Sequence, residues 1–161
     1  MSQKRLSVPS RFMALQYRLY DRVRHRRAFE VARQPGEARS FDGFRGARQA
    51  LMVTFKRSGE PVPTPVNFGL SDNRRLVFRS EPHVAKVKRI RHDPHVRVCP
   101  CNLRGKPRGP VVEGLARILP ESESERAHDA LESNWRPEMK LFERAGDRLG
   151  VPTVYIEVSP A

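Results

Sequence analysis

Three prolines at alternate positions of one strand constrain the fold of this chain more than any other feature. Pro61, Pro63 and Pro65 lie in a run of β-forming residues between two turns. The N–H groups of alternate strand residues point toward the same neighbour, and proline has no N–H to donate. This strand must therefore lie at a sheet edge or beside a gap. The pattern fits protection against edge-to-edge aggregation, and equally a gap where a planar ligand lies against exposed backbone.

The surrounding pattern predicts a small antiparallel barrel. From Ala50 onward, apolar residues alternate with a period of two, and polar turns separate the runs. Six strands are predicted, over residues 50–56, 62–70, 75–80, 95–101, 111–119 and 151–158. A short helix is predicted at 82–91, and two more between residues 122 and 150. Hairpins dominate this order, which favours a mainly β barrel with flanking helices over a doubly wound sheet.

The N-terminal part has a different character. Residues 1–48 contain 12 basic and 4 acidic residues, and we separate them as a basic extension from a barrel domain over residues 49–161. An amphipathic helix is predicted over residues 10–33, with the apolar stripe Phe12, Leu15, Leu19 and Val23, and a short helical piece over 41–48. The helix either packs its stripe on the domain or on a partner subunit, or serves as an arm for a membrane surface or nucleic acid.

The composition limits where in the cell the protein is expected and which cysteine chemistry it can have. No uncharged run in the 161 residues is longer than 11, which is too short for a membrane span, and the N-terminus lacks the apolar segment of a secretory signal. Cys99 and Cys101, the two cysteines, are expected to be free thiols on one strand face, without the further ligands that a metal site needs. These features predict a cytoplasmic protein, with peripheral membrane contact of the basic helix left open.

A candidate anion site lies where the third predicted strand meets the following helix. Arg79 and Ser80 end the strand, and Lys86 and Arg89 share one side of the helix. A helix start offers unpaired N–H donors and a positive dipole end, to which these side chains add a hydroxyl and three cations. The spacing fits a phosphate cradle, and it fits a solvated basic helix equally well.

Other catalytic signals are absent. The chain has no G-x-G-x-x-G, no Walker loop, no H-E-x-x-H and no nucleophile elbow, so no catalytic residue is assigned. Glu113 lies in an apolar strand, where we expect it to face solvent or to pair with Arg117.

Four motifs in order resemble the pyridoxamine 5'-phosphate oxidase superfamily of FMN-binding split β-barrels. They are G-E-P-V-P-T-P-V, L-V-F-R-S, A-K-V-K-R-I-R-H-D-P-H-V-R-V and V-E-G-L-A-R-I-L, and the final strand T-V-Y-I-E-V is a looser match. The resemblance is stronger to the deazaflavin (coenzyme F420)-dependent branch, and it implies a six-stranded split β-barrel.

The resemblance also implies a site. Thr64, Pro65 and Val66 would lie along the cofactor's ring system through backbone groups, while Phe78, Arg79 and Ser80 would flank its phosphate. Lys86 matches the phosphate lysine, and Arg89 would assist it. Homodimers with sites at the subunit interface are implied as well, with Trp135 and Lys140 approaching from the partner.

The chain departs from the FMN-binding branch at three positions. Thr64 and Gly69 stand where those oxidases carry an Arg and a Lys, and Ala85 stands near their helix-entry Arg. These losses favour F420 over FMN, whose enzymes remain the alternative. The expected function is hydride transfer between F420 and an unsaturated or quinone-like small molecule. A non-catalytic flavin, deazaflavin or haem-type carrier is the alternative of another class, and nucleic-acid binding is not expected as the main function.

Overall fold

A computed structural model describes residues 24–161 of the chain. Most of the helix predicted over residues 10–33, including its whole apolar stripe, lies outside the described residues. The described end of that segment is helix α2, Arg26–Ala32, whose first turn is capped because Nδ1 of His25 accepts a 3.1 Å hydrogen bond from the N–H of Arg27. The structure therefore shows only the last two turns of the predicted helix.

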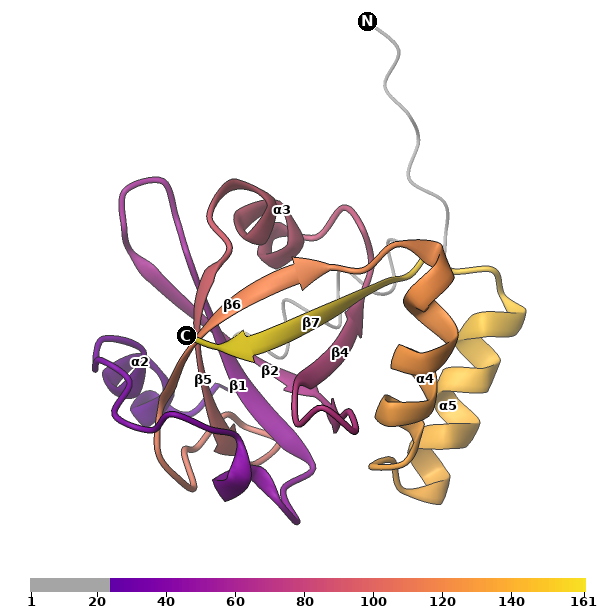
Figure 1. Cartoon of the computed structure of the whole chain (residues 1–161), viewed down its shortest axis with the longest axis horizontal. Helices are drawn as coiled ribbons and strands as arrows, with labels where there is room; N and C mark the ends of the chain where they lie inside the picture. Colours follow the sequence, from indigo (N-terminus) through magenta and orange to yellow (C-terminus); the bar gives the residue numbers. More distant parts are fainter. Residues whose placement is uncertain (1–23) are drawn as a thin grey trace, which may run out of the picture.

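Seven strands form one antiparallel sheet in the order β2-β1-β5-β6-β7-β4-β3 (Figure 1). They are β1 (Gln49–Phe55), β2 (Pro61–Asn67), β3 (Gly69–Leu70), β4 (Leu76–Ser80), β5 (His95–Cys101), β6 (Val112–Ile118) and β7 (Val154–Pro160). The sheet curls until β2 and β4, from its two ends, come into contact. This curled half-barrel confirms the predicted mainly β fold and is consistent with a split barrel.

The helices are α2, α3 (Ala85–His92), α4 (Ser124–Glu132) and α5 (Pro137–Arg148), with 3-10 turns η1 (Asp42–Phe44) and η2 (Glu121–Glu123). The helical piece predicted over residues 41–48 is only η1, because the chain turns at residues 45–46 and enters β1 at Gln49. No helix within residues 24–161 has the length and apolar character needed to cross a lipid bilayer.

The strand predicted over residues 62–70 is two strands, which raises the number of strands from six to seven. β2 pairs with β1, whereas β3 pairs with β4 at the other end of the sheet. Phe68 separates them and is 1% exposed. The chain crosses the split of the barrel at this residue, and burial of the aromatic ring holds the crossing in place.

The proline strand lies at an edge of the sheet, as predicted. β2 has β1 as its one strand partner in the sheet, with Thr64 opposite Met52 and Pro65 opposite Leu51. Because Pro61, Pro63 and Pro65 have no N–H, donors to β1 must come from the residues between them. The proline nitrogens therefore face the open side of the strand.

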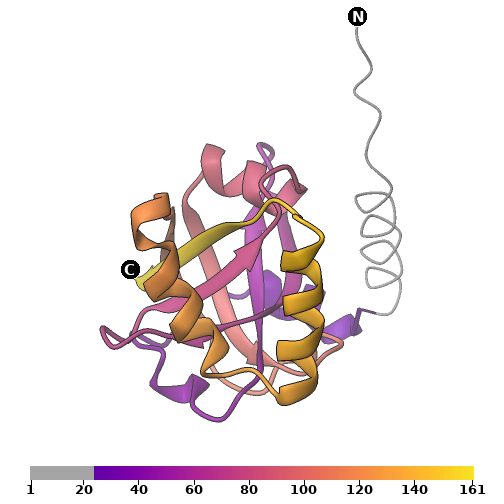
Figure 2. The ribbon, with the colours of Figure 1, turned by 90° about the vertical axis from the view of Figure 1, so that its right-hand side faces the viewer.

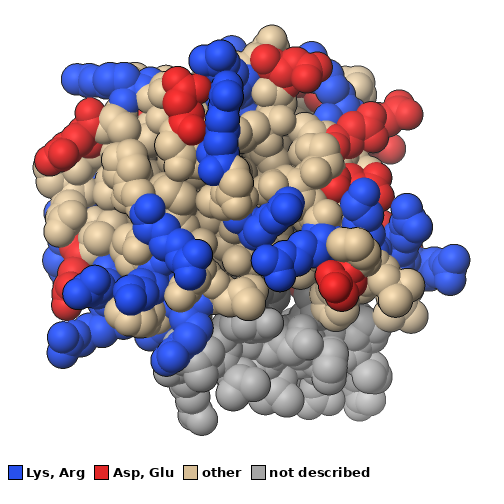
Figure 3. Space-filling model, turned by 90° about the horizontal axis from the view of Figure 1, so that it is seen from below, with Lys and Arg blue, Asp and Glu red and all other residues tan. Residues whose placement is uncertain are grey.

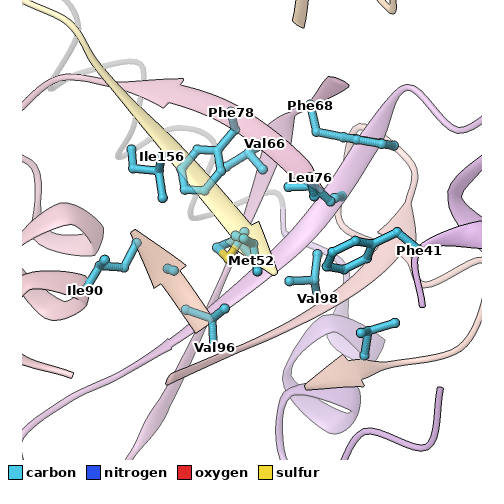
Figure 4. Close-up of a cluster of buried hydrophobic side chains, with 14 of the residues drawn as sticks. Phe41, Met52, Val66, Phe68, Leu76, Phe78, Ile90, Val96, Val98 and Ile156 are labelled. Carbon is cyan, nitrogen blue, oxygen red and sulfur yellow. The ribbon is translucent and has the colours of Figure 1, made fainter. Parts of the chain in front are cut away.

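One core fills the inside of the half-barrel (Figure 4). Phe78 of β4 and Ile156 of β7 are opposite each other in the sheet, and both are fully buried. Phe41 and Phe44 enter this core from the segment before β1, with ring centroids 5.2 Å apart in an edge-to-face arrangement. Burial of these large apolar side chains is the main stabilising contribution to the fold.

The outer face of the sheet is covered at two places. Ala28 and Ala32 of α2 pack on a cluster from β1 and β5 that includes both cysteines, which are free and buried. Burial raises the pKa of the Cys99 thiol to about 12, so it remains a protonated apolar group. At the second place, α4 packs on β4 and β7, and α5 lies beside α4 (Figure 2).

Glu113 of β6 fastens the segment after α2 to the sheet. Its Oε1 accepts a 2.8 Å hydrogen bond from the N–H of Gly36 and another of 2.8 Å from Nε of Arg97, and Nε2 of His95 lies 2.6 Å from Oε2. Arg117, the expected partner, instead pairs with Glu123 and Glu157. The expected pair is wrong because Arg97 lies directly opposite Glu113 across the β5–β6 ladder.

These bonds predict a pH-dependent contribution of Glu113 to stability. Burial raises the pKa of Glu113, but the bonds from Gly36 and Arg97 and the charges of Arg97 and His95 outweigh it, so the pKa is lowered overall. The contribution is complete above the unfolded-state pKa of about 4.3 and is lost as the pH falls through the folded-state pKa. We expect Glu113→Gln to lower the free energy of unfolding by about 1–3 kcal/mol at pH 7.

Urea unfolding of both proteins from neutral pH downward measures this effect. The difference between them should shrink in acid, because protonation then removes the same charge from the parent protein. Glu138→Gln on the exposed surface of α5 is the matched control and should change little. A difference that persists unchanged in acid, or equal losses in both variants, would contradict the prediction.

Candidate phosphate site at the start of helix α3

The predicted site residues lie on three elements, two of which, β2 and β4, meet at the split of the half-barrel. β2 and β4 contact each other, and α3 follows β4 and packs on β1 and β6. Thr64, Pro65 and Val66 lie on β2, Phe78, Arg79 and Ser80 on β4, and Lys86 and Arg89 on α3. The side chains on these elements do not all reach the same place.

Ser80 combines burial with an unused hydroxyl. It ends β4 opposite Val154 of β7, and its side chain is only 6% exposed. Its Oγ is buried and has no hydrogen-bond partner among the described residues. An unpaired buried hydroxyl is unfavourable by about 1–3 kcal/mol, so Ser80 is poised to bind a polar ligand atom.

The N-terminus of α3 follows four residues later and is uncapped. Val84, at the N-cap position, is extended and gives no side-chain hydrogen bond to the first turn. The predicted helix began at Pro82, whereas α3 begins at Ala85, which places Lys86 in the first turn. A helix start without a side-chain cap presents N–H donors and the positive end of the helix dipole to an anion.

Lys86 is buried, with 7% of its surface exposed, while its neighbours Val87 and Ile90 pack into the core. Glu81 lies near enough for the charges of Lys86 and His83 to act on it, but burial has the larger effect and raises the pKa of Glu81. A buried lysine beside a carboxyl whose charged form is disfavoured by burial is a strong position for an incoming anion. A bound phosphate would have to compete with Glu81 for Lys86.

Arg89 connects α3 to the strand next to the proline strand. Its Nε donates a 2.7 Å hydrogen bond to Oγ1 of Thr54, which is 1% exposed. Thr54 lies opposite Val62 in the β1–β2 ladder. The bond from Arg89 therefore holds α3 against β1, which is the neighbour of the edge strand β2. It also keeps the charge of Arg89 at this end of the barrel.

Four of the predicted residues contribute mainly through backbone or packing. Val66 and Phe78 are 6% and 0% exposed, and both side chains belong to the core. Thr64 and Pro65 are half-buried on β2. Their backbone borders the open side of the edge strand, which is where a ring system could lie.

Arg79 points away from this place, toward α5. Its guanidinium pairs with the carboxylates of Glu143 and Asp147 and lies 5.2 Å from the ring of Trp135. Burial lowers the pKa of Arg79, but the hydrogen bond and charge of Glu143, with contributions from Tyr155 and Asp147, raise it overall. Arg79 alternates with Phe78 and Ser80 along β4, so its side chain lies on the outer face of the sheet.

The sequence did not indicate which residues bind Arg89 and Arg79. Thr54 looked like an ordinary strand residue, and no local signal pointed to its bond with Arg89. Glu143 and Asp147 are four residues apart on α5, so their shared helix face was visible as an acidic pair. Nothing in the sequence said that Arg79, more than 60 residues earlier, would face that pair.

The fold is a curled antiparallel half-barrel, consistent with a split barrel, in which a buried hydroxyl without a partner and a buried lysine lie close in sequence around the start of α3. A family model described as pyridoxamine 5'-phosphate oxidase matches residues 36–158. The chain therefore belongs to the pyridoxamine 5'-phosphate oxidase family. No functionally curated protein matches the chain.

Solved structures with a similar fold include the conserved hypothetical protein Rv2991 from Mycobacterium tuberculosis. It is 17% identical, the match covers 79% of this chain and 86% of that one, and the TM-score is 0.56. The FAD binding protein from Mycobacterium smegmatis is 17% identical over 75% of this chain and 86% of its own, with a TM-score of 0.51. A protein named F420 reductase is 18% identical over 78% and 95%, with a TM-score of 0.50. At these identities the likeness concerns the fold alone.

Proposed function

We propose that this protein is an oxidoreductase that binds a phosphate-bearing, flavin-type cofactor at the start of α3. The observation that carries the proposal is the buried, unpaired Oγ of Ser80 beside an uncapped helix start that holds buried Lys86. These groups fit a phosphate: one hydroxyl, backbone N–H donors and one cation. Membership of the family supports the cofactor class.

Coenzyme F420 is the cofactor that we propose, with FMN as the alternative. A Cβ atom at Gly69 would collide with the backbone of Ala130 in α4. A lysine therefore does not fit at this position, where the FMN-binding oxidases carry one. Thr64 is uncharged, and Ala85 is small. The site therefore has fewer cations than an FMN phosphate clamp, which supports the deazaflavin. The solved structure named F420 reductase is compatible with this choice of cofactor.

When bound, the cofactor would supply hydride transfer. The chain's own residues would hold it: Ser80 and Lys86 at the phosphate, Arg89 nearby, and the backbone of Thr64, Pro65 and Val66 along the ring. No side chain is assigned as an acid or base. The proposed substrate is an unsaturated or quinone-like small molecule.

We also propose a homodimer, as the resemblance implies. Leu141, Phe142 and Leu149 are 73%, 55% and 71% exposed, and none of the residues of α5 is buried. Large apolar side chains exposed along one helix are typical of an interaction surface, and a second copy of the chain is the expected partner. Light scattering should give twice the chain mass of 18.5 kDa.

Titration of the purified protein with F420, followed by cofactor fluorescence, tests the proposed function. We expect binding in the micromolar range for F420 and weaker binding for FMN. Tighter binding of FMN would support the alternative cofactor, and binding of neither would contradict the proposal. Binding of F420 without turnover of any quinone or unsaturated substrate would instead indicate a non-catalytic carrier.

Glu81 gives a second test of the phosphate site. Glu81→Gln removes the carboxylate that competes with a phosphate for Lys86, so the affinity for the cofactor should rise several-fold at neutral pH. Because protonation of Glu81 has the same effect, the gain should shrink as the pH falls toward the raised pKa of this group. Glu121→Gln, at an exposed residue of η2, is the control and should leave affinity unchanged. A loss of affinity in Glu81→Gln would mean that Glu81 itself binds the ligand.

A further inference from the structure

A second cationic surface lies across the sheet from α4 and α5. It consists of residues 24–33, which include α2, and the loop of residues 102–110 after β5, and we call it the α2 surface. A 2.6 Å hydrogen bond from the N–H of His25 to the carbonyl of Arg104 joins its two segments. In Figure 1, α2 and α5 stand at opposite sides of the sheet.

The α2 surface is strongly basic. Residues 24–33 and 102–110 contain seven Lys or Arg residues and one acidic residue, Glu30. Arg27, Lys106 and Arg108 are exposed, and no described carboxylate forms an ion pair with them. Lys and Arg side chains also gather on the α2 side of the face that Figure 3 shows. Such a surface attracts anions.

Two large apolar side chains are exposed within this surface. Phe29 of α2 is 40% exposed and Leu103 of the loop is 63% exposed. Arg24 lies over the ring of Phe29, 5.6 Å from its centroid. Exposed apolar side chains among cations are typical of proteins that bind an anionic lipid surface, because apolar groups enter the interface while cations meet the head groups. Phosphate contacts with nucleic acid would use the cations but would gain nothing from Leu103.

The N-terminal sequence continues the same chemistry. Residues 1–23 join the α2 surface directly at Arg24. They contain five basic residues and one acidic residue, together with the apolar stripe Phe12, Leu15, Leu19 and Val23. The sequence that precedes this surface therefore has the same combination of cations and apolar residues.

We infer that the α2 surface binds the face of an anionic phospholipid bilayer. Phe29 and Leu103 enter the interface, and Arg27, Lys106 and Arg108 contact the anionic head groups. This inference does not depend on the proposed cofactor, because none of these residues belongs to the phosphate site.

Sedimentation of the full chain with vesicles tests the charge component. We expect binding to an equal mixture of phosphatidylcholine and phosphatidylglycerol, little binding to phosphatidylcholine alone, and strong weakening at about 0.5 M NaCl. The triple variant Arg27→Glu, Lys106→Glu, Arg108→Glu should lose at least about tenfold in vesicle affinity. The matched control changes three exposed arginines near α4 and α5 to Glu, namely Arg126, Arg136 and Arg148.

A second pair of variants tests the apolar component at constant charge. Leu103→Ser should weaken vesicle binding several-fold. Leu115→Ser, on a residue of β6 that is 48% exposed, should not. Light scattering should show that each variant keeps the mass of the parent protein, so that a change of assembly is not read as a change of binding.

Three outcomes would overturn the inference. The first is an equal loss of vesicle affinity in the triple variant and its control, which would mean that only the net charge of the protein matters. The second is unchanged vesicle binding in the triple variant together with weaker binding to a DNA duplex, which would indicate a nucleic-acid surface. The third is equal binding to neutral and anionic vesicles. Cofactor titration of the variants of the α2 surface should be unchanged, which separates this test from that of the proposed function.

Discussion

Lys86→Ala is expected to weaken cofactor binding by about 1–3 kcal/mol, or roughly 5- to 150-fold. Lys86 is 7% exposed and lies in the first turn of α3, six residues after Ser80, whose buried hydroxyl has no partner among the described residues. Removing the ammonium group takes away a cation in a place shielded from water, where it acts most strongly on an anion. Alanine is also a good helix residue, so the backbone of α3 should be unaffected.

Lys88→Ala provides the matched control, because Lys88 is an exposed lysine two residues further along the same helix. Fluorescence titration of both variants, with a thermal melt to verify folding, gives the comparison. Lys88→Ala should bind the cofactor like the parent protein. Equal affinities for the parent and Lys86→Ala would remove Lys86 from the site, whereas equal losses in both variants would reduce the effect to general attraction by a basic helix.

Phe78→Ala is expected to lower the free energy of unfolding by about 3–5 kcal/mol. The ring is fully buried in the core, beside Ile156 of the neighbouring strand, and its loss leaves a cavity that the strands cannot close. Because Phe78 is two residues before Ser80, it also supports the strand end at the proposed phosphate site. Leu115→Ala, at a side chain that is 48% exposed on β6, should change the free energy of unfolding far less.

Phe78→Leu separates the packing role of this residue from the predicted role beside the cofactor. Leucine keeps most of the apolar volume, so stability should fall by less than in Phe78→Ala. If the ring acts only through the core, the cofactor affinity of Phe78→Leu should match that of the parent protein. A selective loss of affinity with little loss of stability would show that the aromatic ring acts on the ligand.

The strand pattern was largely predictable because it depends on neighbours in the chain. The period of two from Ala50, the turns and the three prolines predicted antiparallel strands and an edge position for β2, and the structure confirms both. The break at Phe68 was not predictable, since alternation continues through it. It follows from the curl of the sheet, which makes residues 67–69 cross between its two ends.

Two of the three cations predicted at the phosphate site show the same limit. Lys86 was placed correctly on the helix after β4, because a short loop and a helix start are local features. Arg79 was predicted beside it, but its side chain lies on the other face of β4, against two carboxylates of α5. The alternation of side chains along β4 does predict that Arg79 lies on the face opposite to Phe78 and Ser80. The carboxylates that Arg79 meets are set by how α5 packs.

The sequence by itself thus determined the strands, the edge position of the proline strand and the cationic helix start at Lys86, since each depends on residues within a few positions of one another. Only the tertiary structure decided that Ser80 would be buried without a partner, that Arg89 would bond Thr54, and that α5 would hold Arg79. The contacts of Arg89 and Arg79 join residues that are 35 and up to 68 positions apart in the sequence. Their proximity is set by curling of the sheet and packing of its helices, which bury apolar surface from the whole chain at once.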